Sequence, residues 1–160
     1  MNTLQLLDIL SRDKFTKTQF LGVYASNQLP KKIHKYPVCL VVNSDKSTEF
    51  GSHWICFYIS SRSKIEFFDS FGNPPSYYKG GISDFAVQYD EMNFNPHMLQ
   101  RPHTAICGQY CIYYLYFKCR GYSLRRIVSR FVSEKYTCND PCVYNFVVRH
   151  FGVKTSYFIQ

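Results

Sequence analysis

The sequence predicts an α+β fold, in which a central sheet packs against a buried helix. Residues 38–71 alternate between runs rich in β-branched and aromatic residues and short polar segments, which is typical of strands joined by turns. Residues 105–120 are apolar almost all round, as expected of a helix at the centre of a domain. The length of 160 residues and the 46% of hydrophobic residues suit one domain, residues 1–160, with a real core.

The first half of the chain contains one predicted helix and three predicted strands. TLQLLDILSR places Leu4, Leu7 and Leu10 at helical spacing, which predicts a short amphipathic helix. The run PVCLVV predicts a buried strand, and the polar segment NSDKSTEFGS after it predicts a loop. HWICFYI and KIEFFDSF predict two further strands, and the polar turn SSRS between them indicates an antiparallel hairpin. The glycine and prolines that follow end this hairpin.

Helices dominate the prediction for the second half. Residues 82–92 are expected to form a helix, and residues 93–102, which include two prolines, an irregular segment. The apolar helix expected over residues 105–120 comes next in the chain. Ser123 is suitably placed to cap a helix over LRRIVSRFVSEKY, whose apolar side chains would share one face. A last helix is expected over residues 140–150, with Pro141 in its first turn.

The N-terminal segment and the cysteines indicate an intracellular protein. Residues 1–14 lack the charged start and apolar run of a secretory signal peptide, and no stretch approaches the roughly 20 apolar residues of a membrane span. The seven cysteines are odd in number, and most of them lie in apolar runs. This pattern predicts buried thiols and no disulfide framework. We therefore expect a protein that is not secreted and not bound to a membrane.

The chain is basic, with 19 Lys and Arg residues, 11 Asp and Glu residues and a formal net charge of +8. Such a charge favours contact with polyanions, including nucleic acid. The solvated side chains of an ordinary basic domain explain the charge equally well, because the basic residues are spread out, with clusters at 31–35 and 120–130. A basic nucleic-acid-binding module without catalysis, in which Cys and His are structural, thus remains an alternative.

Four residues together suit cysteine-dependent acyl transfer, which needs a thiol, a base, a group that orients the base and donors for the oxyanion. Cys107 lies at the expected start of the buried helix, where backbone N–H groups and the helix dipole stabilise a thiolate. His53 and Asp69 lie at the same end of the expected hairpin, so Asp69 can accept from one imidazole nitrogen while the other faces Cys107. Gln100, on the irregular segment, offers a side-chain amide to the oxyanion.

Other interpretations of these residue types stay open. Taken singly, each of the candidates is more often a packing or turn residue than a catalytic one. His103 lies close to Cys107 in the sequence and competes for the role of base. Cys138 and Cys142 are four residues apart and would share a helix face, with His150 further along. A zinc site needs about four ligands, and the second pair is missing, so we expect no metal.

The order and surroundings of the four residues resemble a known family. HW, then FDSFG, then Gln100 followed by Cys107 and Gly108 are similar to motifs of the adenovirus-type cysteine endopeptidases, the adenains. Adenains are related to the proteases specific for ubiquitin-like proteins such as SUMO. The segments FLGVY, VCLVVN, GSHW and RSK are also similar to adenain segments, in the same order. The resemblance covers roughly the first three quarters of the chain, which a chance local motif would not do.

The resemblance implies a cysteine protease fold, in which a mixed sheet packs against the helix that starts at the nucleophile. It implies that Cys107 is the nucleophile, His53 the general base and Asp69 the orienting acid. It gives Gln100 to the oxyanion hole and places Trp54 beside the triad. The implied function is the processing of precursor proteins of a virus or a virus-like element, and a viral source would add the virion and the host nucleus as locations. A deubiquitinase or SUMO-type deconjugating protease is the alternative within the same class.

The resemblance also bears on cofactors and partners. Asp69 stands where adenain has Glu, and either carboxylate can orient an imidazole. Adenain carries a peptide cofactor, joined by a disulfide to a cysteine upstream of the glutamine, but no cysteine lies between Cys56 and Cys107 here. Adenain is also stimulated by DNA, which suits a chain of this charge. We therefore expect a polypeptide substrate, no cofactor for the chemistry itself, and activation by non-specific DNA or by a peptide.

Overall fold

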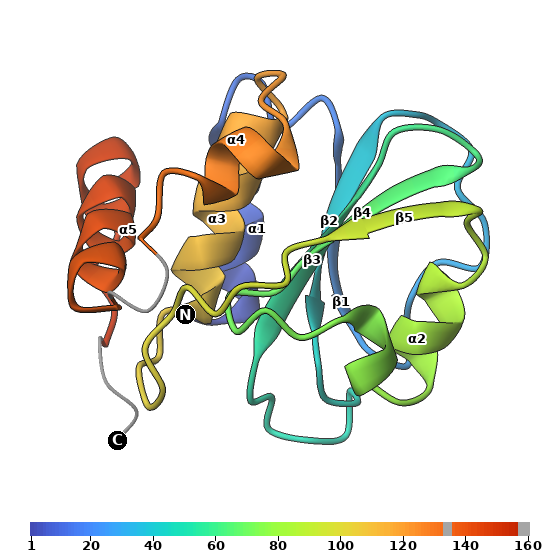
Figure 1. The fold of residues 1–160 in the computed structure, drawn as a ribbon, viewed down its shortest axis with the longest axis horizontal. Coiled ribbons are helices and arrows are strands. Elements are labelled where there is room, and N and C mark those ends of the chain that lie inside the picture. Colours follow the sequence, from blue (N-terminus) through green and yellow to red (C-terminus); the bar gives the residue numbers. More distant parts are fainter. Residues whose placement is uncertain (133–135, 157–160) are drawn as a thin grey trace.

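A five-stranded mixed sheet forms the centre of the computed structural model, which describes residues 1–132 and 136–156 (Figure 1). The strand order follows the sequence. The strands are β1 (Phe20–Ala25), β2 (Val38–Asn43), β3 (Trp54–Ile59), β4 (Lys64–Phe68) and β5 (Glu91–Phe94). The pairs β1–β2 and β4–β5 are parallel, whereas β2–β3 and β3–β4 are antiparallel. This architecture confirms the predicted α+β class and the hairpin at its centre.

Helices lie on both sides of the sheet (Figure 1). One side carries α1 (Thr3–Arg12), α3 (Cys107–Lys118), α4 (Leu124–Val128) and α5 (Tyr136–Phe151). The other side carries α2 (Gly81–Ala86) and the 3-10 helix η1 (Pro75–Tyr77). Helix α3 packs against β3 and is in turn covered by α1, α4 and α5. None of the helices within the described part of the chain is both long and apolar enough to span a membrane.

The sheet separates two hydrophobic cores. Side chains alternate between the faces of a strand, so Cys39 and Val41 of β2 pack toward α3. Val38, Leu40 and Val42 pack on the opposite face, together with Ile82 and Phe85 of α2. Because both faces of the sheet are covered, the sequence of β2 is a continuous apolar run and does not alternate between apolar and polar residues.

Helix α3 is the central element that the apolar run predicts. Residues 107–115 are buried without interruption. Tyrosines in this stretch still need partners for their hydroxyl groups. The hydroxyl of Tyr114 donates to Glu66 at 2.9 Å, and that of Tyr110 lies 2.8 Å from Asp140. The helix is therefore packed into the protein over residues 107–115, and its buried hydroxyl groups have partners.

Three predicted elements differ in the structure. The helix expected over residues 82–92 ends at Ala86, and the chain then forms β5, which is stabilised by pairing with β4. The helix capped by Ser123 ends at Val128, so Val132 is exposed and off the expected apolar face, and the predicted end of this helix lies outside the described residues. Strand β1 was not predicted.

The last helix begins earlier than predicted, and the cysteines are distributed as expected for free thiols. Helix α5 starts at Tyr136, so Pro141 lies inside the helix, where it lacks the N–H that would bond to the preceding turn. All seven cysteines are free. Five of them are buried, whereas Cys138 and Cys142 are exposed on α5.

Candidate active site

The hairpin and the start of α3 bring His53, Asp69 and Cys107 together. His53 directly precedes β3 and Asp69 directly follows β4, and antiparallel pairing puts these two ends side by side. Cys107 is the first residue of α3, which packs against β3. Three residues that are far apart in the sequence thus meet where the open end of the hairpin faces the helix N-terminus.

Asp69 is held by hydrogen bonds to both carboxylate oxygens. Its Oδ1 lies 2.7 Å from Nε2 of His53 and accepts from the Phe71 backbone N–H at 2.9 Å. Its Oδ2 accepts from the backbone and side chain of Asn73, at 3.1 and 2.9 Å, and from the Tyr78 hydroxyl at 2.8 Å. Burial alone would favour the neutral acid, but His53 and the other donors hold the pKa of Asp69 below its ordinary value. Asp69 is therefore a fixed anion.

His53 is fixed by this carboxylate and by aromatic rings. Its imidazole stacks on Phe71, with ring centroids 4.8 Å apart, and lies parallel to Tyr78 at 6.4 Å. Because Nε2 is bonded to Asp69, Nδ1 remains for the sulfur of Cys107, to which the imidazole is hydrogen-bonded. Burial opposes the charged imidazolium, but the hydrogen bonds to Asp69 and Cys107 and their negative charges raise the pKa of His53 to about 10.

Cys107 has an environment that favours the thiolate. Burial alone would raise the pKa of the thiol, but the hydrogen bond and charge of His53 and the backbone N–H of Trp54 lower it below the ordinary value. Gly108 gives the space for this arrangement. A Cβ atom at Gly108 would lie 3.1 Å from Cβ of Met1 and 3.4 Å from the Trp54 ring. The indole N–H of Trp54 donates to the Met1 carbonyl at 3.0 Å, which fixes the ring beside Gly108.

Gln100 lies in the adjoining loop, and its side chain is fully buried. Its Nε2 donates to the carbonyl of Thr104 at 2.7 Å and lies 3.2 Å from the Thr104 hydroxyl. Its Oε1 accepts from the hydroxyl of Ser70 at 2.7 Å, and Ser70 is the residue after Asp69. The structure therefore ties Gln100 to the segment that carries Asp69, while the amide nitrogen points to Thr104.

The remaining candidates from the sequence lie elsewhere. His103 is exposed, with a φ of 66°, on the loop before α3, and the imidazole that bonds Cys107 is that of His53. Cys138 and Cys142 are exposed on α5. Within residues 1–132 and 136–156, no three His, Cys, Asp or Glu side chains are grouped as metal ligands.

Sequence reasoning missed the residues that support Asp69. The backbone N–H of residue 71 bonds the carboxylate of Asp69, a local turn that an Asp followed by Ser, Phe, Gly and Asn can signal. Tyr78 bonds the same carboxylate from nine residues further along the chain. Nothing in the local pattern of the sequence indicates that second contact.

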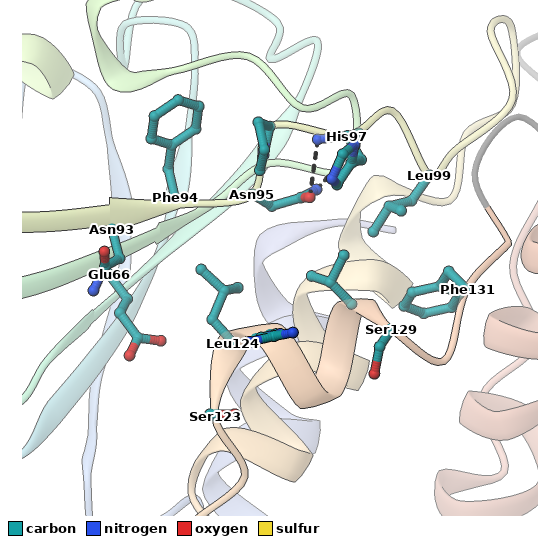
Figure 2. A pocket seen from close by; sticks show the side chains of 13 residues that line it. Glu66, Asn93, Phe94, Asn95, His97, Leu99, Ser123, Leu124, Ser129 and Phe131 are labelled. Carbon is teal, nitrogen blue, oxygen red and sulfur yellow. Dashed lines mark hydrogen bonds between the residues drawn. The ribbon is translucent and has the colours of Figure 1, made fainter.

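Two pockets formed by the described residues adjoin the site. One of 440 Å³ is lined by His53, Phe71 and Tyr77, and another of 380 Å³ by Trp54 and Phe50. A larger pocket, of 590 Å³, lies between β5 and α4. Figure 2 shows that Leu99, on the loop after β5, and Leu124 of α4 reach into this pocket. It is lined by none of the four predicted site residues.

Comparisons with known proteins find a match in three-dimensional structure. No model of a protein family and no curated protein matches the chain. Among solved structures, the crystal structure of the selenomethionine form of the ASFV pS273R protease is similar, with a TM-score of 0.52 and 20% identity. The match covers 85% of this chain and 64% of that protein, so this chain spans less than two thirds of its length. The likeness shows that the two proteins share a fold.

Proposed function

We propose that this chain is a cysteine endopeptidase, with Cys107 as nucleophile, His53 as general base and Asp69 as orienting acid. The observation that carries the proposal is the buried, hydrogen-bonded series from Asp69 through His53 to Cys107 at the start of a central helix. Titratable groups that shift one another in this way are more common at functional sites than elsewhere. The fold shared with the pS273R protease supports the same class.

The chemistry would begin from a thiolate and an imidazolium, since the pKa of His53 is raised and that of Cys107 is lowered. The sulfur attacks the carbonyl carbon of the scissile bond, and the carbonyl electrons move onto its oxygen. When this intermediate collapses, the C–N bond breaks, and His53 gives its proton to the leaving amine. A thioester remains on Cys107. Neutral His53 then takes a proton from water, which attacks the thioester and releases the acid and the thiolate.

Two groups are proposed as donors to the oxyanion. The backbone N–H of Cys107 lies in the first turn of α3, where N–H groups have no acceptor within the helix. The amide of Gln100 is the second. Its nitrogen is 2.7 Å from the Thr104 carbonyl but 3.2 Å from the Thr104 hydroxyl. We expect an oxyanion to take the place of the Thr104 hydroxyl, the more distant of these two acceptors, as a partner of the Gln100 amide.

Digestion of a peptide library tests the proposal. The wild-type protein should cleave members of the library, and Cys107→Ala should lower the rate at least about 10³-fold. Cys111→Ala is the matched control, because Cys111 is also buried, lies one turn along the same helix, and neighbours Cys56. Its rate should stay close to that of the wild type. Cleavage that persists in Cys107→Ala, or a wild type that cleaves nothing, would overturn the proposal.

Precursor proteins of a virus or a virus-like element are the proposed substrates, on the basis of the resemblance to adenain. The alternative substrate is ubiquitin or a ubiquitin-like modifier such as SUMO. Fluorogenic ubiquitin and SUMO derivatives, compared with short peptides that carry glycines before the cleavage site, separate the two. Cleavage of the modifiers alone would favour a deconjugating enzyme.

DNA is proposed as an activator, and the exposed Arg125, Arg126 and Arg130 at and after α4 support this proposal. The guanidinium groups of Arg126 and Arg130 lie over the Tyr122 and Phe117 rings, at 4.5 and 4.3 Å from the centroids, and this contact would hold them in place. Peptidase rates with and without DNA across a salt series test it, because phosphate contacts weaken steeply with salt. An absent DNA effect at low salt would contradict it.

A peptide activator is proposed for the pocket between β5 and α4. Strand β5 is at the edge of the sheet, and Leu99, Leu124 and Phe131 give the pocket an apolar part (Figure 2). An extended peptide can add to such an edge by backbone hydrogen bonds. Leu124→Glu should abolish stimulation by a peptide cleaved from a substrate precursor while leaving the unstimulated rate unchanged. Stimulation that survives this change would place the activator elsewhere.

A further inference from the structure

Asp140, on α5, lies behind the loop that carries Gln100. Only 1% of this residue is exposed. The Arg101 backbone N–H lies 3.3 Å from each of its oxygens, the Thr104 hydroxyl lies 3.1 Å from Oδ2, and the Tyr110 hydroxyl lies 2.8 Å from Oδ1. These three donors are uncharged. A carboxylate from the C-terminal helix is thus the meeting point of the loop and of the helix that begins at Cys107.

This buried carboxylate is costly for folding. Burial raises the pKa of Asp140, even though its hydrogen-bond donors act in the opposite direction. Apolar residues of similar volume commonly serve a core as well as a buried charge does, or better. Packing alone therefore does not explain why a carboxylate occupies this position. The contacts of Asp140 indicate a functional reason.

The contacts lead directly to Gln100. Thr104, which bonds Asp140, accepts the amide of Gln100 through its carbonyl at 2.7 Å. Arg101, which also bonds Asp140, is the next residue in the chain. The Tyr110 hydroxyl, beside Asp140, lies 2.9 Å from the carbonyl of Leu99, the residue before Gln100. Both neighbours of Gln100 in the sequence and the acceptor of its amide are thus fixed around one carboxylate.

We propose that Asp140 is a positioning residue, which holds the loop of residues 99–104 so that the Gln100 amide lies at the oxyanion site. The inference rests on the proposed protease function and adds a residue to it. Asp140 acts through Arg101 and Thr104 and does not touch the substrate. Loss of its charge would loosen the oxyanion donor and leave the contact between His53 and Cys107 intact.

The variant Asp140→Asn keeps the shape of the side chain and tests this role. Its kcat for peptide cleavage should fall about 10- to 100-fold with little change in KM, as expected when an oxyanion donor is misplaced. Alkylation of Cys107 by iodoacetamide should keep its wild-type rate, because this reaction needs the thiolate and no oxyanion donor. Thr104→Val should show the same pattern, and the double variant should lose little more than either single variant.

Asp13→Asn is the matched control. Asp13 is also a largely buried carboxylate that accepts from a backbone N–H and a hydroxyl, those of Thr16, but it lies near Arg120 at the far end of α3. This variant should keep the wild-type kcat. An unchanged kcat in Asp140→Asn, a parallel fall in its Cys107 alkylation, or an equal fall of kcat in Asp13→Asn would each overturn the inference.

Hydrogen exchange separates failure of the inference from failure of the proposed function. Backbone amides of residues 99–104 should exchange faster in Asp140→Asn than in the wild type, and unchanged protection would overturn the inference whatever the activity. A wild type without Cys107-dependent cleavage would overturn the proposed function instead. The exchange data would then still decide whether Asp140 holds this loop.

Discussion

At the scale of single residues, Cys107 and His53 change each other's protonation. Burial disfavours a charge on either group, yet the hydrogen bond between them and the Asp69 carboxylate reverse that tendency. The pKa of His53 is raised to about 10, and that of Cys107 is lowered. Both shifts favour an imidazolium paired with a thiolate, the state in which a cysteine is most nucleophilic.

Selective alkylation tests this ion pair. At pH 7, iodoacetamide should modify Cys107 faster than Cys138, because Cys138 is exposed but is not paired with an imidazolium. His53→Ala should slow the modification of Cys107 at least about 10-fold and leave that of Cys138 unchanged. Mass spectrometry of digested samples, taken over time, measures both sites in the same experiment.

The same measurement separates a protease from a basic nucleic-acid-binding module. In such a module Cys107 would be one buried thiol among several, and the exposed Cys138 and Cys142 would react first. Equal or slower modification of Cys107 in the wild type would therefore contradict the proposed enzyme. It would leave the series from Asp69 to Cys107 without a chemical role.

At the scale of elements, the sequence predicts what local patterns determine. The hairpin of β3 and β4 has a short turn and apolar runs, and α3 is apolar all round, so both were predicted. Strands β1 and β5 are edge strands that pair in parallel with partners distant in the sequence. The first three residues of β5 are exposed, so no apolar pattern identifies it.

The site follows the same rule. The three candidate residues, His53, Asp69 and Cys107, could be grouped from the sequence because the ends of one hairpin and one helix start carry them in a recognisable order. The contact of Asp140 with the Gln100 loop joins residues 39 apart, and it depends on how α5 packs. The direction of the Gln100 amide depends on the conformation of that loop. Neither feature has a local signal in the sequence.

The start of α2 gives a test at this scale, because two neighbouring glycines are required for different reasons. A Cβ atom at Gly81 would lie 1.9 Å from the backbone carbonyl oxygen of Ser26, so Gly81→Ala would push α2 away from the end of β1. Gly80 has a φ of +78° and no described atom within 4 Å of a Cβ, so Gly80→Ala costs only backbone strain.

We expect Gly81→Ala to lower the free energy of unfolding by about 1–3 kcal/mol, as overpacking does. Gly80→Ala should lower it by about 1 kcal/mol. Urea unfolding, followed by the fluorescence of Trp54 and the tyrosines, measures both variants under the same conditions. A Gly81→Ala variant that is no less stable than Gly80→Ala would contradict the close contact between α2 and Ser26.

At the scale of the whole molecule, the ion pair links stability to pH. The folded pKa of His53, about 10, lies above its ordinary value of 6.5. Its contribution to stability is fully present below 6.5 and is lost as the pH rises toward 10. The folded pKa of Cys107 lies below its ordinary value of 9.0. Its contribution is present above 9.0 and is lost as the pH falls through the folded pKa.

These two dependences cancel where their pH windows overlap, because the folded ion pair and the unfolded neutral pair hold the same number of protons. The overlap ends at pH 9.0, the ordinary pKa of a thiol. Within it, the pair should therefore add no pH dependence to the stability of the wild type. Cys107→Ala removes one member. His53, still paired with Asp69, should then make the variant lose stability as the pH rises above 6.5, by at most about 1.4 kcal/mol per pH unit.

The decisive quantity is the difference between variants, in which the contributions of all other titrating groups cancel. Urea unfolding between pH 6.5 and 9.0 at constant ionic strength should give a wild-type curve that diverges from that of Cys107→Ala above the folded pKa of Cys107. Cys111→Ala keeps the ion pair and should run parallel to the wild type. If Cys107→Ala ran parallel as well, the thiol would be neutral in the folded protein. The proposed mechanism would then have to begin with proton transfer from Cys107 to His53 in the presence of substrate.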